Sequence, residues 1–450
     1  MGAAQLHEAI PQRSERAQMI ERILSKDFRK TLLATFTDVY AHHKREEVES
    51  FKQDEERIKK ALLAKVEPHP LDQPLDEDYL VAAVDGSGSA EFATINDVRV
   101  HLLTSATVVL NTGTHDGNLF HEVDHALLKS VYNAEQPLID FHWHTGVRED
   151  ARAKMAETAE HFYPVETIEE IVLPFFRDIL KESSLKSLDD LRDTSYAPYV
   201  DDLSDMKTLI SRAQAMTNAA IHDELRKIFE YSAARRLIDS DLAPKYLLLD
   251  GALSVFLHAG RKYPSLPSGF MLRELLEAAR KKGVIVCAVS KNHTVPFAYQ
   301  IADIARKKFE TPAKWFCLLP SDEDPDGGLH IYEKRTYIPP ILAVPYLFSF
   351  SQDNRPSRID FDRIWWLENI FVPDNPDKTR ENELALFRDL DLMSRDARWY
   401  GYPVALGLAH ERCVLRRDDL RIAREIGRVV QREAHLDFGD IGPLREDYNL

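Results

Sequence analysis

The sequence YLVAAVDGSGS occupies Tyr79–Ser89, where an apolar run of strand-forming residues stops at Asp85 and passes into a Gly-Ser-Gly-Ser tract. A second stretch of the same form, KYLLLDGALS at Lys245–Ser254, stops at Asp250 and Gly251. Each stretch predicts a buried strand that carries a carboxylate at its C-terminal end. A glycine after each aspartate lets the backbone turn sharply and lets a ligand approach the main chain.

Two buried strands that end in carboxylates predict a site for divalent cations. Hydrolysis of a phosphodiester by two such ions needs oxygen ligands that hold the ions about 4 Å apart, and hard Mg²⁺ or Mn²⁺ prefers carboxylates. Asp85 and Asp250 supply two ligands if their strands are neighbours. Glu230, in the helical pattern just before the second strand, is the candidate third ligand. Taken singly, each of these residues is more often a turn, cap or solvated helix position, and the repeated strand-Asp-Gly form favours the site.

The composition is that of a folded globular protein, with 450 residues of which 44% are hydrophobic and 29% charged,. A net charge of −16 argues against a general nucleic-acid coat protein but is compatible with a nuclease that has a local basic strip,. Three cysteines without CxxC spacing indicate neither a disulfide framework nor a thiolate zinc site,. Without a signal-peptide pattern or an apolar run of about 18 residues, we expect a cytoplasmic protein with no membrane segment.

Strand and helix patterns alternate along most of the chain, which predicts an α/β protein with a mixed sheet. Residues 13–66 predict a helical region that ends at a proline-rich connector, Glu67–Pro74. Further strands are expected at Val98–Leu110, Gly283–Val295, Trp315–Leu319, Leu329–Tyr332 and Ile341–Ser349, and helices at Met206–Asp239, Gly269–Lys282, Phe297–Phe309, Glu381–Asp396 and most of the chain after Tyr400.

Five segments resemble the NurA nucleases in content and order. They are VDGSGS with Asp85, FEYSAARRLI with Glu230, LLLDGALS with Asp250, VCAVSKN with Lys291, and YPVALGLAHERCVLRRDDL with His410. The resemblance implies an RNase H-like mixed sheet flanked by helices. It also implies Mn²⁺- or Mg²⁺-dependent cleavage of DNA, as a 5′–3′ exonuclease and single-strand endonuclease. The implied partners are a second copy of the chain and a HerA-type hexameric ATPase translocase, in DNA end processing, repair or anti-phage defence.

The resemblance assigns a role to each of the five residues. Asp85, Glu230 and Asp250 match the metal carboxylates, and Asp85 is the expected bridging ligand because its strand is expected to be central. His410 matches the histidine that completes the site, where it could bind a metal, contact a phosphate or protonate the leaving 3′ oxygen. Lys291 could neutralise charge on the scissile phosphate. Without the resemblance, an interior histidine and a surface lysine are the more frequent interpretations.

The expected organisation has three parts: an N-terminal helical region at residues 1–75, a nuclease domain at residues 76–430 and a C-terminal tail at residues 431–450. The nuclease domain departs from the NurA pattern in a long excursion at about residues 111–205, which we interpret as an insertion.

Two histidine-rich motifs lie in the expected insertion. HEVDH, with His121 and His125 at helical i, i+4 spacing, formally fits a zinc-protease motif,. Its loop-like flanks and the lack of a clear third ligand favour a polar surface or a DNA-facing patch. FHWH, with His142 and His144, is equally ambiguous, and the sequence assigns neither motif a role.

Two other functions remain open from the sequence. An RNase H-like or actin-like fold could use its Asp-Gly turns to bind nucleotide phosphates, as an ATPase does. The chain could also be a non-catalytic scaffold or regulator of a translocase, in which case Asp85→Ala leaves function intact.

Overall fold

A computed structural model divides the chain into two compact units, Met1–Ala64 and Lys65–Leu450. In the first unit, residues 30–38 are helical and their side chains are exposed. The structure describes residues 30–38, 63–72, 78–95, 98–115, 118–123, 139–145, 183–194, 218–253, 267–291, 297–309, 313–319, 343–350, 356–399 and 401–436, with a few single positions between them. Among the described helices, none combines the length and apolarity that crossing a membrane requires.

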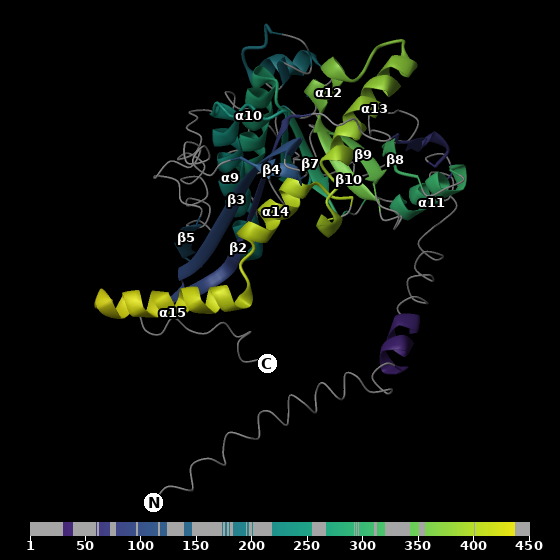
Figure 1. The fold of residues 1–450 in the computed structure, drawn as a ribbon. Coiled ribbons are helices and arrows are strands. Elements are labelled where there is room, and N and C mark those ends of the chain that lie inside the picture. Colours follow the sequence, from purple (N-terminus) through teal and green to yellow (C-terminus); the bar gives the residue numbers. More distant parts are fainter. Residues whose placement is uncertain are drawn as a thin grey trace, which may run out of the picture. The chain divides into compact units, whose positions relative to one another are not determined.

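One mixed sheet forms the centre of the second unit (Figure 1), and the described strands follow the order β1-β8-β9-β10-β7-β6-β2-β3-β4, with β5 also paired to β3. The strands are β1 (His69–Pro70), β2 (Leu80–Ile95), β3 (Val98–His115), β4 (Asn118–Glu122), β5 (Ile139–Thr145), β6 (Tyr246–Asp250), β7 (Ile285–Ser290), β8 (Trp315–Leu318), β9 (Ala343–Ser349) and β10 (Ser357–Asp362).

The five strands β4-β3-β2-β6-β7 have the order and directions of an RNase H-like core. β3 runs antiparallel to both β2 and β4, β6 runs parallel to β2, and β7 runs parallel to β6. β10, β9, β8 and β1 extend this core by antiparallel pairing. The predicted fold class, a mixed sheet flanked by helices, is confirmed.

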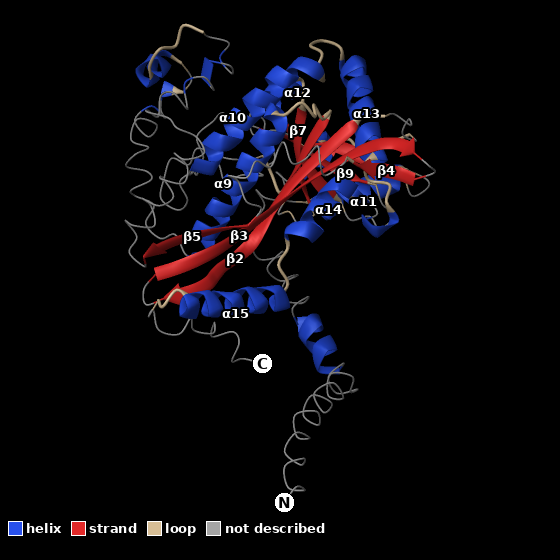
Figure 2. Cartoon of the chain, turned by 60° about the vertical axis from the view of Figure 1, so that its left-hand side comes forward, coloured by secondary structure: helices blue, strands red, loops and turns tan. Residues whose placement is uncertain are grey.

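Helices cover both faces of the sheet (Figure 2). They are α9 (Asn218–Asp239), α10 (Pro267–Lys282), α11 (Ala298–Lys308), α12 (Arg363–Asn369), α13 (Pro376–Leu392), α14 (Val404–Cys413) and α15 (Arg417–Glu433), with 3₁₀ turns η1 (Leu188–Asp193) and η3 (Ala397–Trp399). Alternate residues of a strand point to opposite faces. Ala82 and Val84 of β2 therefore pack with α9 and α10, whereas Val81 and Ala83 pack with α13 and α14.

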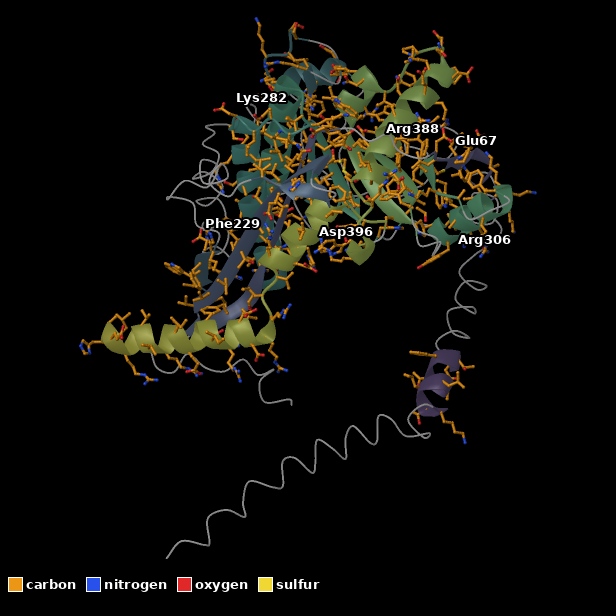
Figure 3. All side chains as sticks on the ribbon, in the orientation of Figure 1. Glu67, Phe229, Lys282, Arg306, Arg388 and Asp396 are labelled. Atoms are coloured by element: carbon orange, nitrogen blue, oxygen red, sulfur yellow. The ribbon has the colours of Figure 1, made fainter. Side chains whose placement is uncertain are left out.

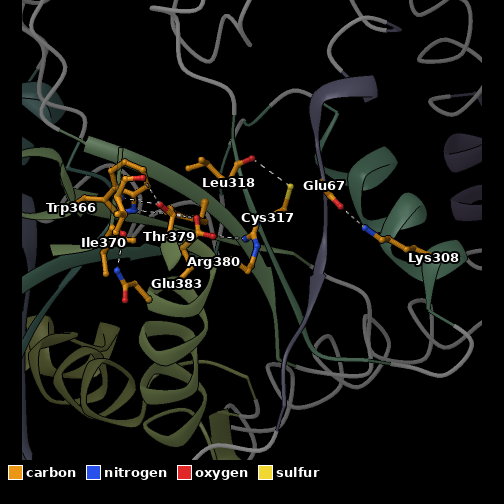
Figure 4. A network of polar contacts seen from close by, with 12 residues as sticks. Glu67, Lys308, Cys317, Leu318, Trp366, Ile370, Thr379, Arg380 and Glu383 are labelled. Carbon is orange, nitrogen blue, oxygen red and sulfur yellow. Dashed lines mark hydrogen bonds and ion pairs between the residues drawn. The ribbon is translucent and has the colours of Figure 1, made fainter. Parts of the chain in front are cut away.

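Polar contacts inside the core hold α13 against the sheet (Figure 4). The buried carboxylate of Glu383 pairs with Arg380 and accepts the hydroxyl hydrogen of Tyr346 on β9 at 2.7 Å. Tyr346 in turn accepts the indole N–H of Trp366 on α12 at 2.8 Å. Because each buried polar group has a partner, this network stabilises the face on which α14 also lies.

The structure corrects the expectation that the first aspartate strand ends at Asp85. β2 continues through the Gly-Ser tract to Ile95 and pairs with β3, with Gly86 opposite Ser105. Backbone hydrogen bonds to an adjacent strand need no apolar side chains, so the polar tract extends the ladder instead of turning. Gly88, at φ +143°, is required there because a Cβ atom would lie 1.9 Å from the carbonyl oxygen of Leu102.

Other differences between the predicted and the observed elements are smaller. β10 was not predicted, because the SRIDFD sequence is short and polar at alternate positions. The segment at residues 111–205 supplies β4 and β5 to the sheet, so part of it belongs to the core. The strand predicted at Leu329–Tyr332, and most of the helical region predicted at residues 13–66, lie outside the described residues.

Candidate metal centre

Asp85 and Asp250 lie side by side on the two central parallel strands. The register pairs Val84 of β2 with Leu249 of β6, and the two aspartates are the next residues along each strand. The alternation of buried residues along both strands directs both carboxylates to the face that α14 covers,. The second strand ends at Asp250, as predicted, and Gly251 follows at φ +100° with no atom within 4 Å of a Cβ position.

The carboxylate of Asp85 is buried and held at both oxygens. Its Oδ1 accepts the backbone N–H of Gly86 at 2.8 Å, and its Oδ2 lies 2.8 Å from Nδ1 of His410 on α14. An ionised carboxylate can only accept, so Nδ1 of His410 carries the hydrogen of this bond. The His410 side chain is 59% exposed, so the ring connects a buried carboxylate to the solvent side of the site.

Glu230 approaches the same region from α9, on the other face of the sheet. A Cβ atom on Gly86 would lie 3.5 Å from Oε2 of Glu230 and 3.2 Å from Cγ of Arg226. Nη1 of Arg226 donates to the carbonyl oxygen of Gly86 at 3.0 Å and lies 3.4 Å from Oε2 of Glu230. The missing side chain of Gly86 therefore lets α9 pack close to β2. The sharp turn that the sequence predicted at this glycine is absent, because the strand continues.

The three carboxyl groups are close enough to disturb one another. Burial raises the pKa of Glu230 to about 8; Arg226 opposes this shift, and Asp85 and Asp250 add to it. Burial, and then the charge of Asp85, raises the pKa of Asp250 as well. Crowded carboxylates with raised pKa values favour a bound cation, because a cation balances the charge that the protein leaves uncompensated.

Tyr402 and Lys291 complete the cluster at the Asp250 end. The hydroxyl of Tyr402 donates to Oδ1 of Asp250 at 3.2 Å, and Nζ of Lys291 lies 3.7 Å from the centroid of the Tyr402 ring. Burial lowers the pKa of the Lys291 ammonium group, while the charges of Asp250 and Asp85 oppose that shift. Asp85, Asp250, Lys291 and His410 therefore lie on one side of the sheet, whereas Glu230 approaches the same region from α9 on the other side. Tyr402 was not predicted, because an aromatic residue before a helix is usually part of the core.

Cys413 is a second residue that the sequence did not indicate. Ligand atoms of Asp85, His410 and Cys413 lie within 4.8 Å of one another. The thiol donates to the carbonyl oxygen of His410 at 3.5 Å, and burial raises the pKa of the thiol. A protonated thiol is a poor ligand for a hard cation, so the oxygen ligands define the chemistry of the site. Cysteine spacing in the sequence gave no signal, because Cys413 has no paired cysteine.

The HEVDH motif does not form a helix where the structure describes it. His121 and Glu122 belong to β4, and His125 lies outside the described residues. Oε2 of Glu122 accepts a hydrogen bond from Nη2 of Arg412 on α14 at 2.8 Å. This bond links β4 to the helix that carries His410. The described part of the motif is therefore strand, with Glu122 exposed and His121 half-buried, and its role as a polar surface or a DNA-facing patch stays a prediction.

No model of a known protein family matches the sequence, and no curated protein does either. Among solved structures, the chain is similar to the NurA nuclease from Sulfolobus solfataricus, with 11% identity, coverage of 92% of this chain and 98% of that chain, and a TM-score of 0.37. A structure of NurA with manganese matches at 11% identity, 94% and 100% coverage, and a TM-score of 0.30. Ciona intestinalis endonuclease V in complex with DNA matches at 10% identity, 84% and 99% coverage, and a TM-score of 0.27. TM-scores this low do not establish a shared function.

Proposed function

We propose that this chain is a divalent-metal-dependent deoxyribonuclease. The observation that carries the proposal is the pairing of Asp85 and Asp250 on neighbouring parallel strands, with buried Glu230 approaching the same region from α9 on the other face of the sheet. Carboxylates brought together in a sheet of this topology are the ligand set that phosphodiester hydrolysis by divalent ions requires. The resemblance of five sequence segments to NurA nucleases supports the same function.

Asp85, Asp250 and Glu230 would hold the ions, because all three offer hard oxygen ligands suited to Mn²⁺ or Mg²⁺. When bound, such ions supply Lewis acidity that activates water and offsets charge on the phosphate. The hydrogen bond from Tyr402 orients the Asp250 carboxylate, and the bond from His410 orients that of Asp85. Partners of this kind are as important to a metal site as its ligands.

His410 and Lys291 would act on the substrate. Nδ1 of His410 is held by Asp85, and its exposed ring can move a proton at Nε2, toward the leaving 3′ oxygen,. Lys291 is exposed at the end of β7, beside Tyr402, where its ammonium group can pair with a phosphate oxygen,.

The finer activity follows from the sequence resemblance. We assign 5′–3′ exonuclease and single-strand endonuclease activity, with a HerA-type translocase as partner, in DNA end processing, repair or anti-phage defence. The support is the order of the five segments, from the one at Asp85 to the one at His410.

We also propose that the chain acts as a homodimer that pairs through α15. Side chains project from this helix into solvent (Figure 3). Ile422, Ile426, Val429 and Val430 form an apolar stripe, and each is between 48% and 57% exposed. The opposite side of α15 is fixed to the sheet, because buried Arg424 donates to the carbonyl oxygen of Phe92 at 2.9 Å.

A second copy of the chain fits this stripe. An antiparallel pair of α15 helices around a two-fold axis packs the apolar stripe of each copy against that of the other,. Sedimentation of wild type beside Ile426→Glu checks this: the variant should be monomeric, and a monomeric wild type contradicts the pairing.

The nuclease proposal is tested with end-labelled linear DNA in Mn²⁺, Mg²⁺ or EDTA. Asp85→Asn and Asp250→Asn should each reduce cleavage by at least about 100-fold, because loss of a direct ligand exceeds the loss caused by a partner residue. Asp241→Asn is the matched control, since Asp241 is exposed in the turn after α9. Inactive wild type calls for the same assay with a translocase added. Cleavage that survives both substitutions refutes the site, and ATP hydrolysis without DNA favours the ATPase alternative.

A further inference from the structure

The turn that precedes α14 carries two aromatic side chains with different partners. The hydroxyl of Tyr402 donates to Asp250, and the backbone N–H of Tyr402 donates to the carbonyl oxygen of Trp399 at 2.7 Å. This backbone bond fixes Trp399, at the end of η3, relative to a residue that contacts the carboxylate site. The carboxylate site accounts for the position of Tyr402 but not for that of Trp399.

The indole ring of Trp399 lies flat against the backbone of α14 at Gly407. A Cβ atom on Gly407 would lie 2.8 Å from each of three ring atoms, Cδ2, Cε2 and Nε1. A point at the same distance from three atoms of one ring lies over the face of that ring. Any side chain at this position would therefore displace the indole, and the glycine lets α14 support one face of it.

The place where Trp399 meets α14 is close to His410. Gly407, His410 and Glu411 lie on one face of α14, because residues three and four positions apart are neighbours on a helix,. Gly407 and His410 are separated by about 4.5 Å along the helix axis. The indole is thus supported less than one helical turn from the histidine that is hydrogen-bonded to Asp85.

The guanidinium group of Arg398 covers the Trp399 ring, with Cζ 4.4 Å from the ring centroid. Because Gly407 occupies one face of the ring, Arg398 lies over the opposite face. Nε of Arg398 donates to Oδ1 of Asp396 at 3.1 Å, and Nη2 donates to Oδ2 at 2.9 Å. Two parallel hydrogen bonds of this kind fix the plane of a guanidinium group, while the Arg398 side chain remains 63% exposed.

Arg398 and Lys291 lie around the same carboxylate. Hydrogen bonds to Asp396 raise the pKa of Arg398, and the charge of Glu411 adds to this rise. Burial lowers the pKa of Lys291, and the charge of Glu411 is among those that oppose this shift. One carboxylate on the His410 face of α14 therefore acts on both cations. A DNA strand whose phosphate reaches His410 and Lys291 passes beside Arg398.

We propose that the stacked side chains of Arg398 and Trp399 bind an unpaired base of the DNA strand, next to the phosphate that is cleaved. This inference rests on the proposed nuclease function, because its ligand is the strand that the carboxylate site would cut. Bases stack on guanidinium planes and aromatic rings with little regard to sequence, so the stack selects single strands. A base inside a duplex has both faces covered and has to leave its neighbours before it can bind here.

The stack is arranged to hold a base with little loss of freedom on binding. Trp399 supports the guanidinium group of Arg398 from the side of α14, and Asp396 fixes its plane, so its outer surface is in place before the strand arrives,. A base held there would set the position of the strand along α14 and bring one phosphate to His410. Arg398 and Trp399 would thus position the substrate without touching the reacting atoms.

The test measures how strongly the full-length protein prefers bases, in EDTA so that no metal supports cleavage. Fluorescence anisotropy gives the affinity for a short single strand and for an abasic strand of the same length and charge. Wild type should bind the intact strand at least about tenfold more tightly than the abasic strand. Trp399→Leu and Arg398→Lys should each lower this preference about tenfold, with unchanged affinity for the abasic strand. Trp399→Phe, which keeps an aromatic face, should retain most of it.

Two variants serve as controls for folding and for charge. Arg398→Lys keeps the positive charge at an exposed position, so its circular dichroism should equal that of wild type even if Trp399→Leu disturbs α14. Arg306→Lys on α11 is the matched control, because Arg306 is also exposed and paired with an aspartate, and it should keep the wild-type preference.

Cleavage of the same intact strand in Mn²⁺ separates this inference from the nuclease proposal. The Arg398→Lys variant should raise KM about tenfold and leave kcat unchanged, as expected for lost substrate binding. If wild type cuts DNA but the Arg398 and Trp399 variants keep its preference for bases, the stack is refuted and the nuclease proposal stands. Equal affinity of wild type for intact and abasic strands refutes the stack as well. If wild type cuts no DNA in any metal, the nuclease proposal fails, whereas a preference lost in Arg398→Lys still supports base binding.

Discussion

Replacing Glu230 with glutamine should change how the stability of the metal-free protein depends on pH. Burial raises the pKa of Glu230 from its usual 4.5 to about 8. In the unfolded chain the carboxyl titrates at its usual value, so the folded protein binds a proton that the unfolded chain releases. The stability that the neutral carboxyl supports is fully present below pH 4.5 and is lost as the pH rises to about 8.

The size of the effect follows from the width of this window. One pKa unit corresponds to about 1.4 kcal/mol, so wild type should lose up to roughly 4–5 kcal/mol across it. Glutamine carries no charge at any pH and escapes this loss. We expect Glu230→Gln to be similar in stability to wild type near pH 4.5 and several kcal/mol more stable near pH 8.

Urea unfolding in EDTA, followed by circular dichroism at a series of pH values, measures the difference. Glu368→Gln on α12 is the matched control, because Glu368 is exposed, and its curve should run parallel to that of wild type. Adding Mn²⁺ should stabilise wild type more than Glu230→Gln, since the variant lacks one ligand. Parallel pH curves for wild type and Glu230→Gln would refute the reasoning, because they would mean that Glu230 is ionised in the folded protein at no cost.

Three further substitutions probe the fold and the site. Gly88→Ala should destabilise the protein by about 3 kcal/mol or more, measured as a lower urea midpoint, because its Cβ would meet a carbonyl oxygen of β3 at 1.9 Å. Tyr402→Phe should raise the Mn²⁺ concentration for half-maximal cleavage about tenfold, since Asp250 loses its 3.2 Å hydrogen bond; unchanged Mn²⁺ dependence would contradict this. Arg358→Met should lower the unfolding free energy by about 3–5 kcal/mol, because Asp360 is fully buried and both of its carboxylate oxygens accept hydrogen bonds from Arg358. An unchanged urea midpoint would show that Asp360 does not need the positive charge of Arg358.

The strands that carry the carboxylates could be predicted because their signal is local. Apolar runs of β-forming residues that stop at Asp85 and Asp250 mark buried strands, whatever their neighbours are,. The helix of Glu230 was visible for the same reason, since its apolar spacing lies within one segment. The RNase H-like arrangement was implied by the resemblance of five segments to the NurA nucleases, and the strand order in the structure agrees with it.

Features that depend on close approach could not be predicted. Gly86 and Gly88 resemble a turn in the sequence, yet both lie inside β2, where one faces Arg226 and the other faces the backbone of β3. The sequence alone does not distinguish a glycine that is needed in a turn from a glycine that is needed under a packed helix. The contact of Tyr402 with Asp250 is equally hidden, because the two residues are 152 positions apart in the sequence.

The two clusters of titratable side chains differ in how the sequence encodes them. A carboxylate at the end of an apolar run is unusual enough to be noticed alone, so the sequence by itself pairs Asp85 with Asp250. His101 sits in a strand pattern and His222 in a helical pattern, where a single histidine is ordinary. They become unusual only when the register of β3 with β5 and the packing of α9 leave their nitrogens buried without partners. Buried clusters of ordinary residues at regular positions are therefore visible only in the fold, which is why the stacked rings of His101, His144 and His222 emerge from the structure and the carboxylate pair from the sequence.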